Sequence, residues 1–140
     1  MSEQWNRKTC PACFQGTLEQ RVKRTHFEYR GRVLEYDQEG AWCNRCDEGI
    51  VTGNEATASE SLLDDFIARV DREEASELAH IRKKLGLTQK EAAMIAGGGH
   101  NAFSRYERGE ARPVAAVVNL FRLLDRHPEL LKELKKQKAA

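Results

Sequence analysis

The chain has 140 residues, of which 40% are hydrophobic and 32% charged, a composition that suits a folded soluble protein and excludes general disorder. No apolar run approaches the roughly 18 residues that a bilayer-crossing helix needs, and the first residues lack the apolar segment of a signal peptide, so we expect a cytoplasmic protein with no membrane partner. The formal net charge of +1 conceals an asymmetry, because residues 1–75 carry 10 basic and 15 acidic side chains and residues 76–140 carry 13 and 7.

This charge asymmetry favours two domains, residues 1–75 and 76–140, with different partners. An acidic surface suits a basic protein, and a basic surface suits a polyanion. Charged residues that are merely solvated would give the same counts. The motifs must therefore decide the function of each domain.

The first predicted element is a β-hairpin over residues 21–42. Apolar or β-branched residues alternate with polar ones along its first half, as in a strand with one buried face (Thr25, Phe27, Tyr29). A turn is predicted at Arg30-Gly31-Arg32, after which the second half resumes with Val33, Leu34 and Tyr36. The N-terminal domain therefore contains β-structure.

The four cysteines form two CxxC pairs on either side of this hairpin, Cys10 with Cys13 and Cys43 with Cys46, separated by 29 residues. Each pair can turn both thiolates toward one point, and two pairs complete a tetrahedral shell of sulfur. Soft thiolate ligands in that geometry favour Zn²⁺. Since four protein ligands leave no open coordination position, we predict a structural zinc site of zinc-ribbon type.

Three alternatives for the cysteines are weaker. A thioredoxin-like redox pair requires a βαβ context, which the sequence lacks. Two structural disulfides require an oxidising compartment, and nothing directs the chain to one. His26 as a fifth or substitute ligand is less expected than His26 as a surface residue of the strand.

A helix follows from about Asn54 to Ala75. Its apolar residues recur at the spacing of one helical stripe (Leu63, Phe66, Ile67, Val70). Thr57 and Glu60 have the spacing of a capping box at its start. This helix is expected to pack on the cysteine-containing domain or to link it to the rest of the chain.

The C-terminal domain is predicted to be all-α, with about five helices, so that the whole chain is α+β. Glycines separate the first three of these helices, and prolines precede the last two. The signals are, in chain order, an apolar stripe at Leu78, Ile81 and Leu85 that ends at Gly86; a capping box at Thr88 and Glu91; a break at Gly97-Gly98-Gly99; a short helix over 101–108; a longer helix after Pro113; and a last helix after Pro128.

This order of helices is typical of a helix-turn-helix domain, whose second motif helix enters the major groove of DNA. Asn101 and Arg105 stand four residues apart and therefore on one face, while Phe103 and Tyr106 face the core. Asn suits adenine and Arg suits guanine, so these two are the predicted base-reading residues. The alternatives are that Asn101 only caps the helix and that Arg105 only pairs with a nearby glutamate.

Further contacts to DNA are expected from the polar and basic residues around this helix. His100 and Ser104 are placed to touch a phosphate or a base. The remaining basic side chains would supply charge for contacts to the DNA backbone (Lys90, Arg108, Arg82, Lys83, Lys84, Arg112).

Several segments of the chain resemble one known family. The segments Arg82–Ala92 and Gly97–Gly109, the two CxxC pairs ahead of them and the run Leu123–Leu131 together resemble the MqsA (YgiT-type) antitoxins. The resemblance extends from Cys10 to about Leu134, and few helix-turn-helix proteins also carry this zinc ribbon. Nine residues precede Cys10, where the family often begins almost at its first cysteine.

The resemblance implies an antitoxin of a type II toxin–antitoxin pair. In that family the N-terminal zinc domain binds the toxin, a small mRNA-cleaving ribonuclease. The C-terminal domain forms a homodimer that represses the shared operon at a palindromic operator in double-stranded DNA. The zinc cysteines of the family match Cys10, Cys13, Cys43 and Cys46, and its base-reading residues match Asn101 and Arg105.

Enzymatic activity is not expected. The sequence offers neither a His-Cys nor a paired-carboxylate arrangement, and a four-cysteine metal site is closed to substrate. The alternative function is a free-standing transcription regulator whose zinc domain binds another protein partner.

Overall fold

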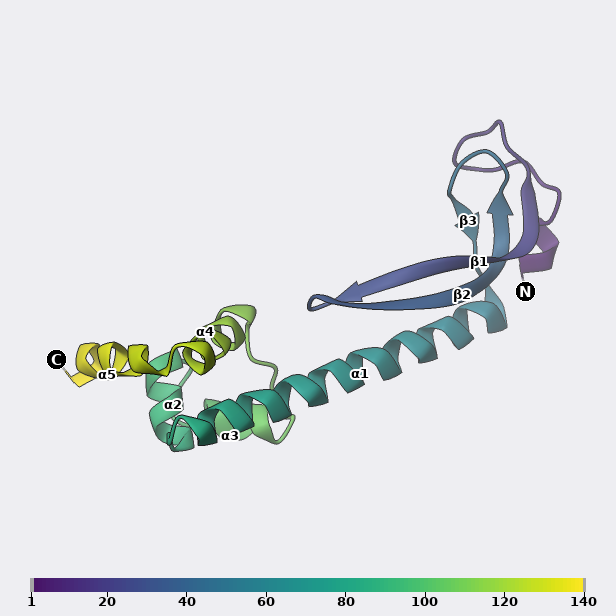
Figure 1. Ribbon diagram of the computed structural model, residues 1–140. Helices are drawn as coiled ribbons and strands as arrows, with labels where there is room; N and C mark the ends of the chain where they lie inside the picture. The colour runs from purple at the N-terminus through teal and green to yellow at the C-terminus, as the bar shows by residue number, and fades with distance from the viewer. Residues whose placement is uncertain (1, 140) are drawn as a thin grey trace. The chain divides into compact units, whose positions relative to one another are not determined.

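The structure, a computed structural model, describes residues 2–139 (Figure 1). Over this range a three-stranded antiparallel sheet precedes five α-helices, which confirms the predicted α+β class. None of these helices combines the length and the apolarity that crossing a membrane demands. The elements are, in chain order, η1 (Ser2–Trp5), β1 (Leu18–Tyr29), β2 (Arg32–Cys43), β3 (Gly49–Ile50), α1 (Gly53–Lys84), α2 (Gln89–Ala96), α3 (Ala102–Glu107), α4 (Ala115–Arg126), η2 (Pro128–Leu130) and α5 (Leu131–Ala139).

The chain divides into two compact units, Met1–Ala68 and Arg69–Ala140. The division falls inside α1, a single helix of 32 residues that joins the two helical segments expected on either side of residue 75. No glycine or proline interrupts the sequence between Asn54 and Gly86, so the backbone continues as one helix. The functional boundary at residue 75 stays a prediction.

In the first unit, β1 and β2 form the predicted hairpin, and their pairing extends from Leu18 opposite Cys43 to Tyr29 opposite Arg32. Only Arg30 and Gly31 connect the strands, and both have positive φ, 49° and 78°. A two-residue turn of this kind has the twist that a tight hairpin requires, and glycine adopts its second position without strain. The hairpin is longer than predicted at its open end, because β1 begins at Leu18 and β2 ends at Cys43.

One face of the hairpin is partly buried. Phe27 lies opposite Leu34 in the register, and its ring meets the ring of Phe66 on α1 edge-to-face, with centroids 6.1 Å apart. Phe66 is buried, as the predicted apolar stripe of the helix requires. The residues on the other face are exposed, including Val22 and Val33.

The capping box predicted at Thr57 is wrong. Helix α1 begins at Gly53, one full turn earlier, so Thr57 lies inside the helix. Its hydroxyl donates a hydrogen bond to the carbonyl oxygen of Gly53 at 3.1 Å. Threonine in a helix commonly bonds the carbonyl four residues before it, and this local bond replaces the predicted cap.

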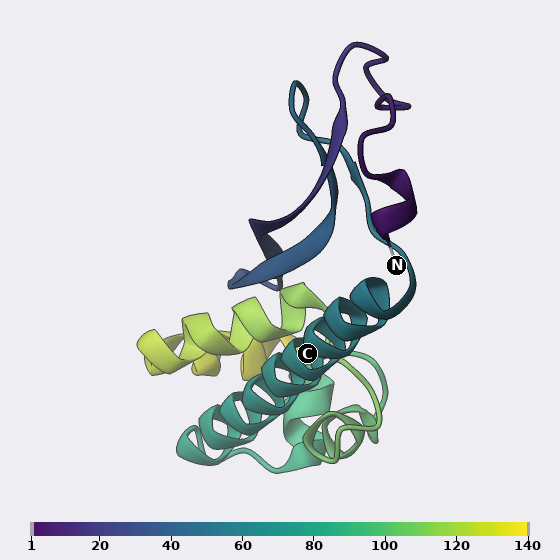
Figure 2. The same cartoon turned by 90° about the vertical axis from the view of Figure 1, so that its right-hand side faces the viewer.

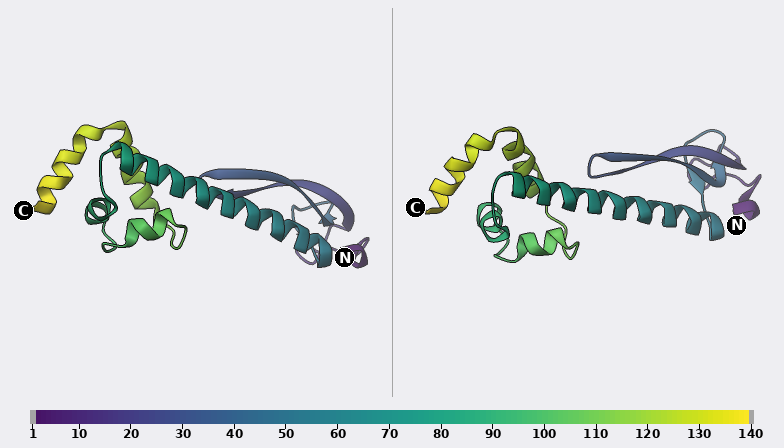
Figure 3. Two further views of the ribbon diagram at one scale, coloured as in Figure 1. Left: turned by 90° about the horizontal axis from the view of Figure 1, so that it is seen from below. Right: turned by 60° about the horizontal axis from the view of Figure 1, so that its bottom comes forward.

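The second unit has a core formed by the C-terminal part of α1 together with α2, α3, α4 and α5. Phe103 and Phe121 are completely buried at its centre, with ring centroids 4.9 Å apart. Arg122 of α4 forms a two-pronged ion pair with Glu77 of α1, both hydrogen bonds being 2.8 Å long. Figure 2 shows α4 next to the C-terminal part of α1, and Figure 3 shows α2 and α3 following that helix end.

Local signals fix the turns that lead to α3. Gly86 has φ +71°, and the N–H groups of Gly86 and Leu87 donate to the carbonyls of Lys83 and Arg82, a Schellman arrangement that ends α1 at the predicted glycine. Thr88 and Glu91 form the predicted capping box of α2. The glycines at 97–99 have φ values of 85°, 90° and 90°, so the chain leaves α2 there.

Candidate functional site: a four-cysteine centre and the exposed face of α3

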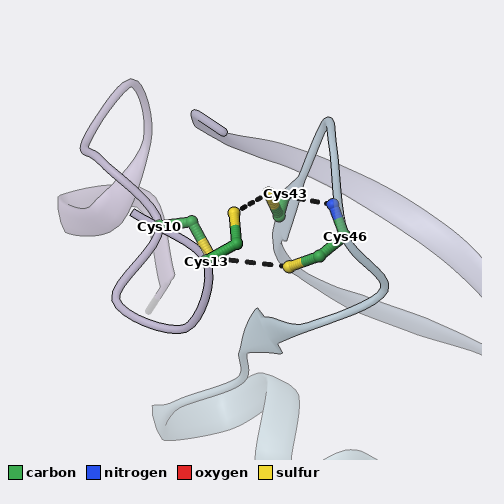
Figure 4. A group of neighbouring side chains, drawn as sticks. All are labelled: Cys10, Cys13, Cys43 and Cys46. Carbon is green, nitrogen blue, oxygen red and sulfur yellow. Dashed lines mark hydrogen bonds between the residues drawn. The ribbon is translucent and has the colours of Figure 1, made fainter. Parts of the chain in front are cut away.

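The two CxxC pairs converge on one point in the first unit (Figure 4). The four Sγ atoms all lie within 4.8 Å of one another. Sγ of Cys10 is 3.6 Å from Sγ of Cys46, and Sγ of Cys13 is 3.7 Å from Sγ of Cys43. All four cysteines are free thiols, so the disulfide alternative does not apply to this structure.

These sulfur–sulfur distances are those of a metal shell. A tetrahedral ion with metal–sulfur bonds of about 2.3 Å separates its sulfur ligands by about 3.8 Å. Two pairs between the CxxC turns, at 3.6 and 3.7 Å, match that edge length. The four cysteines can therefore hold a metal ion with all its ligands supplied by the protein.

Backbone N–H groups point at the sulfurs. The N–H groups of Ala12 and Gly16 donate to Cys10 and Cys13 at 3.4 and 3.3 Å, and those of Arg45 and Cys46 donate to Cys43 at 3.3 Å. Such bonds stabilise thiolates, the form that binds metal. Each CxxC turn thus orients its sulfurs and prepares them to be ligands.

The pKa values of the cysteines indicate that the four thiols cannot all ionise without a cation. Backbone N–H groups of Gln15 and Gly16 lower the pKa of the Cys13 thiol to about 6, and the N–H of Cys46 lowers the pKa of Cys43. At Cys46 the N–H of Glu48 favours the thiolate, but burial and the neighbouring cysteines outweigh it and raise its pKa to about 12. Four negative sulfurs so close together need a cation among them, and a soft divalent ion suits this donor set.

Gly16 makes the close packing around the sulfurs possible, and sequence reasoning missed it. It is buried, and its carbonyl accepts a hydrogen bond from the N–H of Cys10 at 2.9 Å. A Cβ atom at this position would overlap Sγ of Cys43 and lie 3.0 Å from Cβ of Arg45. The glycine after a CxxC pair was the available signal, because only glycine allows such an approach.

Gly16→Ala is therefore expected to lower the affinity for metal by about 10–100-fold, since it displaces Cys43 and disturbs the N–H that orients Cys13. Competition with a chromogenic chelator measures this affinity. Gln15→Ala changes only an exposed neighbouring side chain and should keep the wild-type value. Equal affinities in the two variants would contradict the role of Gly16.

Asn101 and Arg105, the predicted base-reading residues, are both exposed at α3 in the second unit. The N–H of Arg105 donates to the carbonyl of Asn101 at 3.1 Å, so the two are one helical turn apart on the same face. Asn101 occupies the N-cap position, but its side chain makes no capping hydrogen bond. Capping therefore does not occupy the amide group of Asn101.

The acidic residues near Arg105 are paired with other arginines. Glu110 accepts from Arg108 at 3.0 Å, and Glu107 accepts from Arg82 at 2.8 and 2.9 Å. Among residues 2–139 no ion pair of Arg105 is seen, so its guanidinium group points to solvent. Phe103 and Tyr106 pack inward with ring centroids 5.5 Å apart, as predicted.

The other residues predicted to contact DNA around α3 differ in their exposure and in their contacts within the protein. Lys90 and His100 are exposed, and Ser104 is half-buried. Arg108 is exposed and lies against Glu110 and the carbonyl of Ser104.

Besides Arg108, three of the basic residues expected to contact the DNA backbone have acidic partners within the second unit: Lys84 pairs with Asp125 at 2.8 Å, and Arg82 and Arg112 are also paired. The guanidinium group of Arg82 is bound inside the unit, so the expectation that it contacts DNA is withdrawn. Arg112 pairs with Asp71 at 3.0 Å. Both partners lie far from these arginines in the sequence, and for this reason the pairs escaped sequence reasoning.

Comparison with known proteins finds the cysteine centre and α3 within one protein family. Residues 8–135 match the family described as the antitoxin component of bacterial toxin-antitoxin system, MqsA. Antitoxin MqsA of Escherichia coli is 43% identical over 130 residues, which cover 90% of this chain and 98% of that protein. The solved N-terminal domain of the E. coli protein MqsA is similar with a TM-score of 0.42 and 30% identity, over 44% of this chain and 94% of that one. The family match includes the four cysteines and α3.

Proposed function

The chain belongs to the MqsA antitoxin family, and on that premise we propose that it neutralises an mRNA-cleaving ribonuclease toxin and, as a homodimer, represses its own operon. Members of this family are the antitoxin components of toxin–antitoxin systems and are not enzymes, in agreement with the prediction from sequence. The observation that carries the proposal is the match over residues 8–135, which joins the cysteine centre to α3 in one family.

The N-terminal domain is the toxin-binding part of this proposal. Its metal is Zn²⁺, because four thiolates at tetrahedral spacing form a closed site of the kind that structural zinc occupies. The ion fixes the fold around the two CxxC turns and supplies no reaction. The acidic excess of residues 1–75 suits a toxin that must itself be basic to bind RNA.

The C-terminal domain is the DNA-binding part. In a helix-turn-helix arrangement α3 enters the major groove, and Asn101 and Arg105 read adenine and guanine there. Ser104 lies on the same helix, His100 and Arg108 flank it, and Lys90 lies on α2; in this proposal these four contact the DNA backbone or a neighbouring base. A homodimer would place two copies of α3 in successive major grooves, about 34–36 Å apart, on a palindromic operator. These partners, mRNA-cleaving toxin and DNA, require a cytoplasmic location.

Co-expression tests the toxin-binding half of the proposal. The tagged chain is produced together with the product of the open reading frame adjacent to its gene, and both co-purification and RNA cleavage are measured. We expect a stable complex in which cleavage stops, because an antitoxin acts by binding its toxin. Arg105→Ala should bind the partner as wild type does, since it alters only the DNA-reading face. A chain that binds its own promoter but no adjacent product would instead be a free-standing regulator.

A further inference from the structure

A buried ion pair lies behind the exposed face of α3. Nε and Nη2 of Arg82, near the end of α1, donate to the two carboxylate oxygens of Glu107 at 2.8 and 2.9 Å. The two side chains are only 11% and 12% exposed. The third branch of the guanidinium group, Nη1, donates to the carbonyl of Leu87 at 2.8 Å. One arginine thus binds α1, the turn before α2 and the last residue of α3 to one another.

This pair acts on a helix that cannot hold its own orientation. Helix α3 has six residues, fewer than an isolated helix needs to be stable. Residues of an α-helix are separated by about 100°, so Glu107 lies roughly 200° around the axis from Arg105, on the opposite side. Holding the Glu107 side inward therefore determines the direction in which Arg105 points.

The chemistry of the pair suits orientation better than stability. A planar guanidinium group that meets a carboxylate through two parallel bonds accepts only a narrow range of geometries. A buried pair contributes little net stability over apolar residues of similar volume, because both charges must leave water. Its distinctive contribution is to make one orientation of the helices lower in free energy than slightly rotated ones.

We propose that Arg82 and Glu107 are positioning residues that set the rotation of α3 and thereby the sequence specificity of DNA binding, although neither touches DNA. This inference rests on the proposed DNA-binding function of the chain. The buried pair makes Asn101 and Arg105 selective for their bases, while contacts to the phosphate backbone, which tolerate small rotations, depend on it little.

The test replaces both charges at once, with the double variant Arg82→Met/Glu107→Met in the full-length, zinc-loaded protein. Two methionines are close in volume and leave no unpaired buried charge, so the unit should still fold. Thermal melting checks the fold. The measurement is the ratio of affinities for DNA from immediately upstream of the coding sequence and for a scrambled duplex of equal length. We expect the ratio to fall at least about tenfold while affinity for the scrambled duplex changes little.

The matched control is Arg122→Met/Glu77→Met. This pair also joins α1 to a later helix through two parallel hydrogen bonds, but it is 44% and 40% exposed and is not part of α3. Its ratio should equal that of the wild type. If the first double variant does not fold, Arg82→Lys keeps the charge but not the two-pronged geometry, and the ratio should again fall.

The outcomes separate the inference from the function on which it rests. A wild-type ratio in a folded Arg82→Met/Glu107→Met variant, or in Arg82→Lys when that variant replaces it, would overturn the positioning role alone. A wild-type chain that does not distinguish upstream DNA from the scrambled duplex would overturn the DNA-binding function and the inference together.

Discussion

Removal of the zinc ion proposed for the four-cysteine centre is expected to unfold the N-terminal unit and to leave the C-terminal unit folded. The buried cluster beside this centre consists of Cys10, Leu18, Ala41 and Cys43, so two of its four members belong to the proposed ligand set. Structural zinc stabilises small domains by about 10–16 kcal/mol, which is comparable to or larger than the whole stability of a typical domain. Without the ion, this part of the chain has too small a core to stay folded.

Cys43→Ser should have the same effect, because an alcohol cannot replace a thiolate in a soft tetrahedral site. Amide NMR spectra recorded before and after chelation follow the two units separately. Signals of residues 5–50 should collapse toward random-coil positions, whereas those of Phe103 and Phe121 in the other core should remain. Adding acid is expected to cause the same loss of structure in the N-terminal unit, because protons compete with the metal for the thiolates.

Arg45→Ser is the matched control for the cysteine variant. It changes an exposed side chain between two of the ligands and keeps all four sulfurs, so its metal content and spectrum should be those of the wild type. If chelation left both units folded, the metal would not support the N-terminal fold. If both units unfolded together, the two-domain division would be wrong.

The features that the sequence predicted well are those set by neighbouring residues. Glycine at a positive φ fixed both the hairpin turn at Gly31 and the end of α1 at Gly86. The capping box of α2 depends on Thr88 and Glu91, three residues apart. The CxxC spacing needs only one short turn to bring two sulfurs together, and the hairpin then brings the second pair back to the first.

The features that it did not predict depend on contacts between distant residues. Arg82 and Glu107 are 25 residues apart, and the sequence shows no local sign that Arg82 turns inward instead of toward DNA. The start of α1 was predicted to within one residue, but the capping box was misplaced because Thr57 suits a cap and a helix interior almost equally by sequence. The short strand β3 pairs with Ala41 and Trp42, and a two-residue strand has no periodicity by which to find it.

Arg105→Ala is expected to weaken binding to the operator by about 1–3 kcal/mol and to relax preference at one base pair. The side chain is exposed, lies on the face of Asn101, and has no ion pair to lose within residues 2–139, so the change removes the proposed contact to DNA and no ion pair within the protein. Affinities for the operator and for single-base variants of it measure the effect. The variant should lose discrimination at one position and keep it elsewhere.

Arg108→Ala separates base reading from general charge. Arg108 is also exposed and follows Arg105 by less than one turn, but it lies against Glu110 and the carbonyl of Ser104. If Arg108 contacts the DNA backbone, its loss should weaken binding equally on every sequence and lower the slope of log affinity against log salt concentration by about 1.

Asn101→Ala should behave like Arg105→Ala at a neighbouring position without the usual cost of a lost cap, because the Asn101 side chain makes no capping bond. A uniform loss on all sequences for Arg105→Ala would make Arg105 a phosphate contact and would move base recognition to another residue of α3.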